Sequence, residues 1–177
     1  MGRLYSVFTK VMFSTMILLI PSSCLLAQEN GAQYSKNAIF VEGLGSGIFY
    51  SINYDHRFTP NISGRVGFTS WSLSGFFFDT KLSATAFPII VNYLLGDGAS
   101  HLELGIGIVP MNLSINGGEA FFGSDINGHA TVVLGTADVG YRLQPNEGGI
   151  FVRFSFTPLF TFQKFQPWGG VSLGASF

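Results

Sequence analysis

The chain has little charge, a single cysteine and, beyond its N-terminal segment, no long hydrophobic run. Charged residues make up 11% of the 177 residues, whereas soluble domains carry roughly 25%. That is too little charge to cover a water-facing surface of normal size. Hydrophobic residues reach 47%, yet no later apolar stretch approaches the ~20 residues that a membrane-spanning helix needs. The apolar residues must therefore be spread by alternation, as they are in β-strands.

Two further absences exclude classes of function. The net charge is −1, which leaves no basic surface for nucleic acid. The one cysteine, Cys24, lies in the N-terminal segment, so the rest of the chain has neither disulfides nor thiolate metal ligands. The sequence also contains no glycine-rich phosphate loop and no metal-ligand spacing. We therefore expect no cofactor, no metal site and no catalytic residues.

The first segment has the order of features found in a secretory signal peptide. Arg3 and Lys10 supply the positive charge, an apolar core runs from Val11 to Ile20, and Ala27 is a small residue suited to cleavage. Two alternatives stay open at this stage, an uncleaved N-terminal anchor and lipidation at Cys24. Cleavage after Ala27 divides the chain into a signal peptide at 1–27, a polar lead-in at 28–36 and a barrel domain at 37–177.

Beyond the lead-in, apolar and polar residues alternate with the period of two that marks a strand with unlike faces. In the clearest run one face carries Ile48, Tyr50, Ile52, Tyr54 and Phe58. Compact turns are expected at 59–61, 96–98 and 145–148, and connections of other kinds at 45–47, 72–81, 111–129 and 161–166. These divisions predict an all-β fold, an eight-stranded antiparallel up-and-down transmembrane β-barrel. The strand count depends on a reversal of the chain at 45–47.

The charged residues indicate which face of the strands points inward. A lipocalin also has eight strands, but with an apolar interior. Here the lysines Lys36, Lys81 and Lys164 are expected in the lead-in or loops, whereas the strands carry equal numbers of acids and arginines. Arginine forms multidentate pairs with carboxylates, which suits a narrow enclosed lumen. The predicted lumenal charge network comprises Glu42, Asp55, Arg57, Arg65, Glu103, Asp138, Arg142 and Arg153.

Aromatic residues gather near both ends of the predicted strands, as expected for a barrel that crosses two membrane interfaces. The group near the compact turns comprises Tyr54, Phe58, Tyr93, Tyr141 and Phe177. The group at the opposite end comprises Phe76, Phe77, Phe78, Phe160, Phe162, Phe165 and Trp168. Two such belts favour lipid outside and a polar lumen inside.

The C-terminal residues carry a family resemblance. Phe177, with apolar residues at every second position before it, resembles the terminal strand that the barrel-assembly machinery recognises. The region from Asn37 to Phe177 is similar to the small OmpA/OmpX-type barrels. Within it, the segments 37–42, 91–96 and 167–170 resemble small outer-membrane barrels of the Bacteroidetes group. The resemblance implies this fold and a bacterial outer-membrane location, and it implies no reaction.

Three histidines, His56, His101 and His129, are far apart in the sequence, and we assign structural roles to the first two. His129 with Ser124 and Asp125 would form a Ser-His-acid set similar to that of lipid-modifying barrels, but no local motif supports it. The loop 115–123 offers either a binding surface or a Phe121–Phe122 contact with lipid headgroups. We therefore expect no enzymatic activity.

The sequence as a whole predicts an outer-membrane barrel with a structural or surface-interaction role and a lumen closed by paired charges. Its expected partners are outer-membrane lipid and, during biogenesis, the barrel-assembly machinery, and it is expected to be a monomer. Three alternatives remain, a lipid-modifying enzyme, a narrow channel and a soluble lipocalin-like binding barrel.

Overall fold

The computed structural model describes residues 34–74, 81–116, 128–161 and 163–177. The predicted signal peptide at 1–27, with Cys24 and Ala27, lies outside the described residues, and so does the lead-in up to residue 33. Within the described residues, no helix has the length and hydropathy needed to cross a bilayer.

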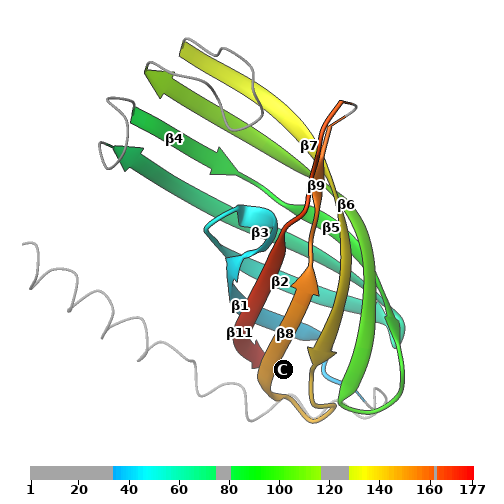
Figure 1. Ribbon diagram of the computed structural model, residues 1–177. Coiled ribbons are helices and arrows are strands. Elements are labelled where there is room, and N and C mark those ends of the chain that lie inside the picture. The colour runs from blue at the N-terminus through cyan, green and yellow to red at the C-terminus, as the bar shows by residue number, and fades with distance from the viewer. Residues whose placement is uncertain (1–33, 75–80, 117–127, 162) are drawn as a thin grey trace, which may run out of the picture. The chain divides into compact units, whose positions relative to one another are not determined.

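In the described ranges, eleven strands form a single antiparallel sheet that closes on itself (Figure 1). The strands are β1 (Asn37–Leu44), β2 (Tyr50–Thr59), β3 (Ile62–Ser74), β4 (Lys81–Ala86), β5 (Ile89–Leu95), β6 (Ser100–Asn116), β7 (Gly128–Leu143), β8 (Gly149–Phe156), β9 (Leu159–Phe160), β10 (Phe165–Gln166) and β11 (Gly169–Ser176). The first strand pairs with the last, from Ala38 opposite Ser176 to Leu44 opposite Gly170. This pairing closes the ring and satisfies the backbone groups that an open edge would expose.

Three of the strand boundaries are short interruptions, each within a segment that crosses the barrel wall once. We call each such segment, interrupted or not, a stave. Two residues separate β4 from β5, β8 from β9 and β10 from β11, and each gap contains a proline: Pro88, Pro158 and Pro167. Proline has no N–H to donate to a neighbouring strand, so it interrupts the ladder. The eleven strands therefore make eight staves, which confirms the predicted eight-stranded up-and-down barrel.

The connection between β1 and β2 is the short 3-10 turn η2 (Gly45–Gly47), so the chain does reverse there as predicted. One residue beside it differs from the prediction. Ile48, expected on the outward face, has φ 73° and only 5% exposure. Because this backbone conformation turns the side chain inward, Ile48 joins an apolar cluster inside the barrel, and β2 begins at Tyr50.

Three of the predicted loops are shorter than expected, and in the connection at 161–166 the last two residues form β10. β6 continues to Asn116 and β7 starts at Gly128, so residues 111–116 and 128–129 are strand rather than loop. On the preceding hairpin, β3 runs to Ser74 and Lys81 is the first residue of β4 rather than a loop residue. Ser, Thr and Asn side chains in these segments suggest loops by composition, but here they form one polar face of a paired sheet.

The outward side chains of the staves form an exposed apolar belt. On β5 and the residue pair before it, Phe87, Ile89, Val91, Tyr93 and Leu95 all face outward and are exposed. This run spans nine residues, close to the ~9–11 that a tilted transmembrane strand requires. Corresponding outward positions on the other staves carry further exposed apolar residues, including Val66, Ile106, Val139, Phe154 and Leu173. The orientation is opposite to that of a lipocalin.

The aromatic belt near the compact turns lies as predicted. Its five members, Tyr54, Phe58, Tyr93, Tyr141 and Phe177, are 40–64% exposed. At the other end, Phe76, Phe77, Phe78 and Phe162 lie outside the described residues. Trp168 was wrongly placed in that belt, because it packs against the inner apolar cluster and its Nε1 donates to the Ile48 carbonyl at 3.2 Å. Phe68 and Phe87 face outward at this end, with ring centroids 5.3 Å apart.

Candidate functional site: the lumen and the outer sheet

The centre of the lumen is a buried ion-pair network around Arg153, on β8. Its guanidinium lies 2.8 Å from Glu42 on β1, 3.0 Å from Glu103 on β6 and 2.5 Å from Asp138 on β7. Every side chain in these pairs has 0% exposure. One arginine thus holds carboxylates from three other staves, which its planar multidentate geometry allows.

Two further arginines extend this network across the barrel. Arg65 on β3 contacts Glu42 at 3.2 Å and Asp138 at 2.8 Å. Arg142 on β7 lies 2.6 Å from Glu103 and forms a bidentate pair with Asp55 on β2, at 3.0 and 2.9 Å. Ser63 and Asn92 also donate to Asp55. Of the eight predicted lumenal residues, seven therefore lie in one connected network.

The eighth predicted residue, Arg57, lies beside this network at the compact-turn end of the lumen. It donates to the Pro60 carbonyl at 2.6 Å, lies 4.6 Å from the Tyr34 ring centroid and is 3.4 Å from His101 Nε2. The seven-residue network contains four carboxylates and three guanidiniums. Arg57 supplies the nearby positive charge that balances the remaining carboxylate.

Apolar and polar contacts bound the network at both ends. Towards the compact turns, Phe40 and Phe151 are buried and stacked with centroids 4.5 Å apart. Ser35, in the lead-in, donates to the Pro145 carbonyl at 2.9 Å and accepts from Gln144. At the opposite end lies a buried cluster comprising Ile48, Ala84, Ala86, Val109, Met111, Leu113, Leu134 and Leu159. The charged layer therefore meets an aromatic pair and polar contacts towards the compact turns, and an apolar cluster at the opposite end.

The strands β3, β4, β6 and β7 extend past the other staves at the end opposite the compact turns (Figure 1). We call this extension the outer sheet: residues 69–74, 81–86, 111–116 and 128–132. Where it begins, the outward side chains change from apolar to polar, and the inward side chains change from polar to mainly apolar. The outward row that follows the apolar belt is Ser70, Thr85, Asn112 and Thr131, which lie side by side in register. The inward row Thr69, Ala86, Met111 and Val132 belongs mainly to the apolar cluster.

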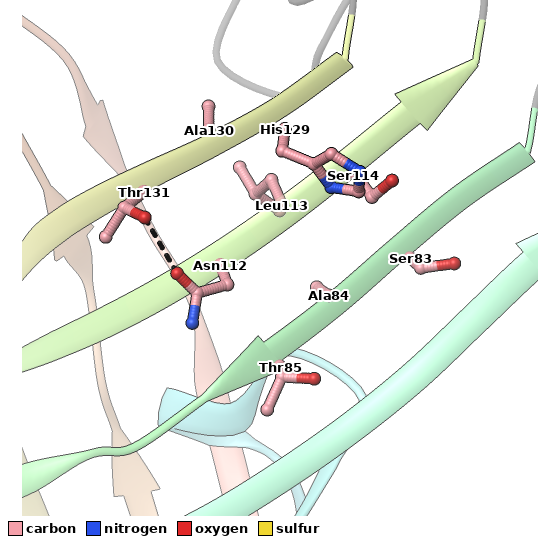
Figure 2. Close-up of a pocket in the computed structure, with 9 residues that line it drawn as sticks. All are labelled: Ser83, Ala84, Thr85, Asn112, Leu113, Ser114, His129, Ala130 and Thr131. Carbon is pink, nitrogen blue, oxygen red and sulfur yellow. Dashed lines mark hydrogen bonds between the residues drawn. The ribbon is translucent and has the colours of Figure 1, made fainter.

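The outward face of the outer sheet carries a shallow trough of about 380 Å³ (Figure 2). Two polar rows form its walls, Ser83, Ser114 and His129 on one side and Thr85, Asn112 and Thr131 on the other. Between them runs the row Ala84, Leu113 and Ala130, of which Ala84 and Leu113 are buried in the inner cluster. Sequence reasoning missed this trough because it assigned 111–129 to a loop, although residues 111–116 already alternate in polarity.

The histidines and the terminal residue occupy separate places. His56 is hydrogen-bonded to Asn37 at 2.8 Å, His101 is buried beside Arg57, and His129 is exposed on the outer sheet. Ser124, Asp125 and Phe121–Phe122 lie outside the described residues. Phe177 exchanges two backbone hydrogen bonds with Asn37, both 2.8 Å. In the described part of the chain, no group of three His, Cys, Asp or Glu side chains is placed to hold a metal ion.

Comparison with known proteins identifies the fold. The N-terminal β-barrel domain of OprF from Pseudomonas aeruginosa is similar with a TM-score of 0.61, at 14% identity, over 83% of this chain and 99% of that domain. The attachment invasion locus protein Ail of Yersinia pestis gives a TM-score of 0.48 at 11% identity, over 80% of this chain and 97% of Ail. No family model and no curated protein sequence matches the chain.

The chain thus has the fold of the small OmpA/OmpX-type outer-membrane β-barrels, as the sequence resemblance predicted. Its exposed apolar belt is stable only against lipid, since water would contact every one of those side chains. The barrel therefore lies in a bacterial outer membrane, with its polar side chains inside.

Proposed function

We propose that this protein is a non-enzymatic outer-membrane barrel whose lumen is sealed and whose outer sheet acts in surface interaction or envelope structure. The observation that carries the proposal is the seven-residue ion-pair network. Its arginines and carboxylates come from six of the eight staves and have 0% exposed side chains. Eight staves enclose a lumen just wide enough to be filled by side chains.

The energetics of buried charge support a permanently closed lumen. Opening a path for ions would separate Arg153 from its three carboxylates or Arg142 from Asp55, and an uncompensated buried charge costs several kcal/mol. The apolar cluster beyond the network would also have to admit water. A sealed barrel leaves its outer surface as the part that meets other molecules.

Planar-bilayer recording tests the sealed lumen. The purified barrel should give no stepwise conductance above the protein-free bilayer, in contrast to a narrow channel. Asp55→Ala with Arg142→Ala should still assemble and provides a widened-lumen control. Regular single-channel steps from the wild-type protein would overturn the sealed-lumen proposal.

The enzymatic alternative has its own test. A deletion strain should retain its lipid A and phospholipid profile, because we propose no reaction for this barrel. A changed profile that wild type restores and His129→Ala does not restore would establish the lipid-modifying alternative instead. We further propose outer-membrane lipid and the barrel-assembly machinery as partners, and a monomeric state.

A further inference from the structure

The trough on the outer sheet exists because its polar side chains form hydrogen bonds towards different neighbouring strands. Ser83 and Thr85 on β4 hydrogen-bond towards β3, to Ser72 at 2.9 Å and Ser70 at 3.2 Å. On β6, Asn112 pairs in the opposite direction, accepting from Thr131 at 2.8 Å (Figure 2). Because the β4 side chains bond towards β3 and Asn112 bonds towards β7, none of these bonds crosses the seam between β4 and β6, and the seam is left open on this face.

Among the residues that the structure describes, the trough is lined by hydrogen-bonding groups without fixed charge. Four hydroxyls, one amide and one imidazole line it, and this described lining contains no Lys, Arg, Asp or Glu. The Asn112 amide nitrogen points away from Thr131 and is available as a donor (Figure 2). Hydroxyl and amide groups both donate and accept, as sugar hydroxyls do. Recognition of phosphate would instead call for arginine or lysine, so this chemistry matches a neutral saccharide.

The position of the trough limits what can occupy it. It lies on the same outward face as the lipid-contacting belt, and its first row follows Phe68 and Phe87 directly along the strands. Successive outward residues on a strand are roughly 7 Å apart. A molecule in the trough therefore meets the barrel just beyond the acyl chains, at the level of the lipid headgroups.

We infer that the trough binds the neutral saccharide headgroup of a glycolipid in the outer leaflet. The lipid anchor holds the sugar at a high effective concentration beside the barrel, so a few hydrogen bonds are sufficient for occupancy. A free sugar lacks this advantage and binds far more weakly. The inference rests on the surface role proposed above for the outer sheet, with the short turns on the periplasmic side as is usual for such barrels, and it does not depend on whether the lumen conducts.

The test uses the full mature barrel in phosphatidylcholine nanodiscs, with backbone amide NMR as the readout. Digalactosyl diacylglycerol is the neutral glycolipid probe. Its addition should give saturable shifts at the trough residues on β4, β6 and β7, and should leave the compact turns at 96–98 and 145–148 unchanged. Phosphatidylglycerol, and the free digalactosylglycerol headgroup at the same total concentration, should give no comparable shifts.

Two matched variants separate recognition from general effects on the barrel. Asn112→Leu removes an amide from the trough and should weaken the glycolipid response roughly fivefold, the equivalent of about one hydrogen bond. Asn146→Leu makes the same exchange in the turn after β7 and should leave the response unchanged. Both should keep the heat-dependent gel mobility of a folded barrel.

Three results would overturn the inference. The first is an equal response from Asn112→Leu and wild type. The second is a response to phosphatidylglycerol, or to the free headgroup, that matches the glycolipid response. The third is a shift pattern that is absent from the trough or spread evenly over the barrel. None of these would affect the conductance result, so failure here is distinguishable from failure of the sealed-lumen proposal.

Discussion

Arg142 on β7 and Asp55 on β2 join opposite walls of the barrel through a bidentate pair, with Nη1–Oδ1 at 3.0 Å and Nη2–Oδ2 at 2.9 Å. Three staves lie between them around the ring in either direction. Because both side chains are fully buried, this pair fixes the distance between the two walls as well as neutralising both charges.

Removal of one member of this pair should destabilise the barrel strongly. Asp55→Ala leaves the Arg142 guanidinium with Glu103 as its remaining carboxylate partner, and broken buried pairs typically cost about 3–5 kcal/mol. Unfolding by urea in lipid vesicles would measure the loss. Asp97→Asn, in the exposed turn after β5, should be close to neutral. The double exchange Asp55→Leu with Arg142→Met should recover much of the stability, and equal losses in the single and double variants would contradict this explanation.

Closure of the ring should be sensitive to one glycine. A Cβ on Gly174 would overlap the Ile39 carbonyl and the Phe40 backbone on β1. Gly174→Ala should therefore destabilise the β1–β11 pairing by about 1–3 kcal/mol, the usual cost of overpacking. Gly43→Ala lies on the same strand pair, where the nearest atom is 3.8 Å away, and should be tolerated. Denaturant titration of both variants decides the matter, and equal stabilities would show that β1 can shift to admit the methyl group.

The two tryptophans should be shielded from lipid. Trp71 and Trp168 both pack against the inner apolar cluster, not in the outward belt. In vesicles with brominated acyl chains, wild-type tryptophan emission should be quenched little. Val91→Trp places an additional indole in the middle of the outward face of β5 and should be quenched strongly. Comparable quenching of the wild type would mean that the indoles contact lipid.

The terminal residue gives a prediction about assembly. Deletion of Phe177 removes the backbone partner of Asn37 and an exposed aromatic ring at the compact-turn end. Export should continue, while the amount of folded barrel should fall, as measured by gel mobility with and without heating. Phe165→Ala removes an exposed aromatic ring at the opposite end and serves as the control. Normal levels of folded barrel after the deletion would contradict the assembly role of Phe177.

The lumen could be predicted from the sequence because its charges are few and occur at alternating positions. Once the outward face was assigned to apolar residues, Glu42, Arg65 and Arg153 could only point inward. Which acid meets which arginine could not be predicted, since partners such as Arg142 and Asp55 lie 87 residues apart and depend on the stagger of the strands. Arg57 was counted with the network because alternation places it on the inner face but does not give its position along the barrel axis.

The outer sheet was missed for a different physical reason. Polar and apolar residues still alternate there, but the polarity of the two faces is reversed. Ser, Thr and Asn point outward, and Leu, Met and Val point inward. A prediction that expects apolar residues outside interprets this reversal as the end of the strand. Ile48 and Trp168 escaped prediction in the same way, because both contribute to a small water-excluding core that lies beyond the lipid belt.

The change from apolar to polar residues across a single row also sets how deeply the barrel is immersed. Ser70, Thr85, Asn112 and Thr131 lie in register, so a sinking movement would bring all four into hydrocarbon at once, at roughly 1–3 kcal/mol for each group that lost its hydrogen bonds. A rising movement would expose Phe68 and Phe87 to water. Displacement in either direction is therefore opposed, and this row of the sheet holds the barrel at a fixed height and tilt on this side.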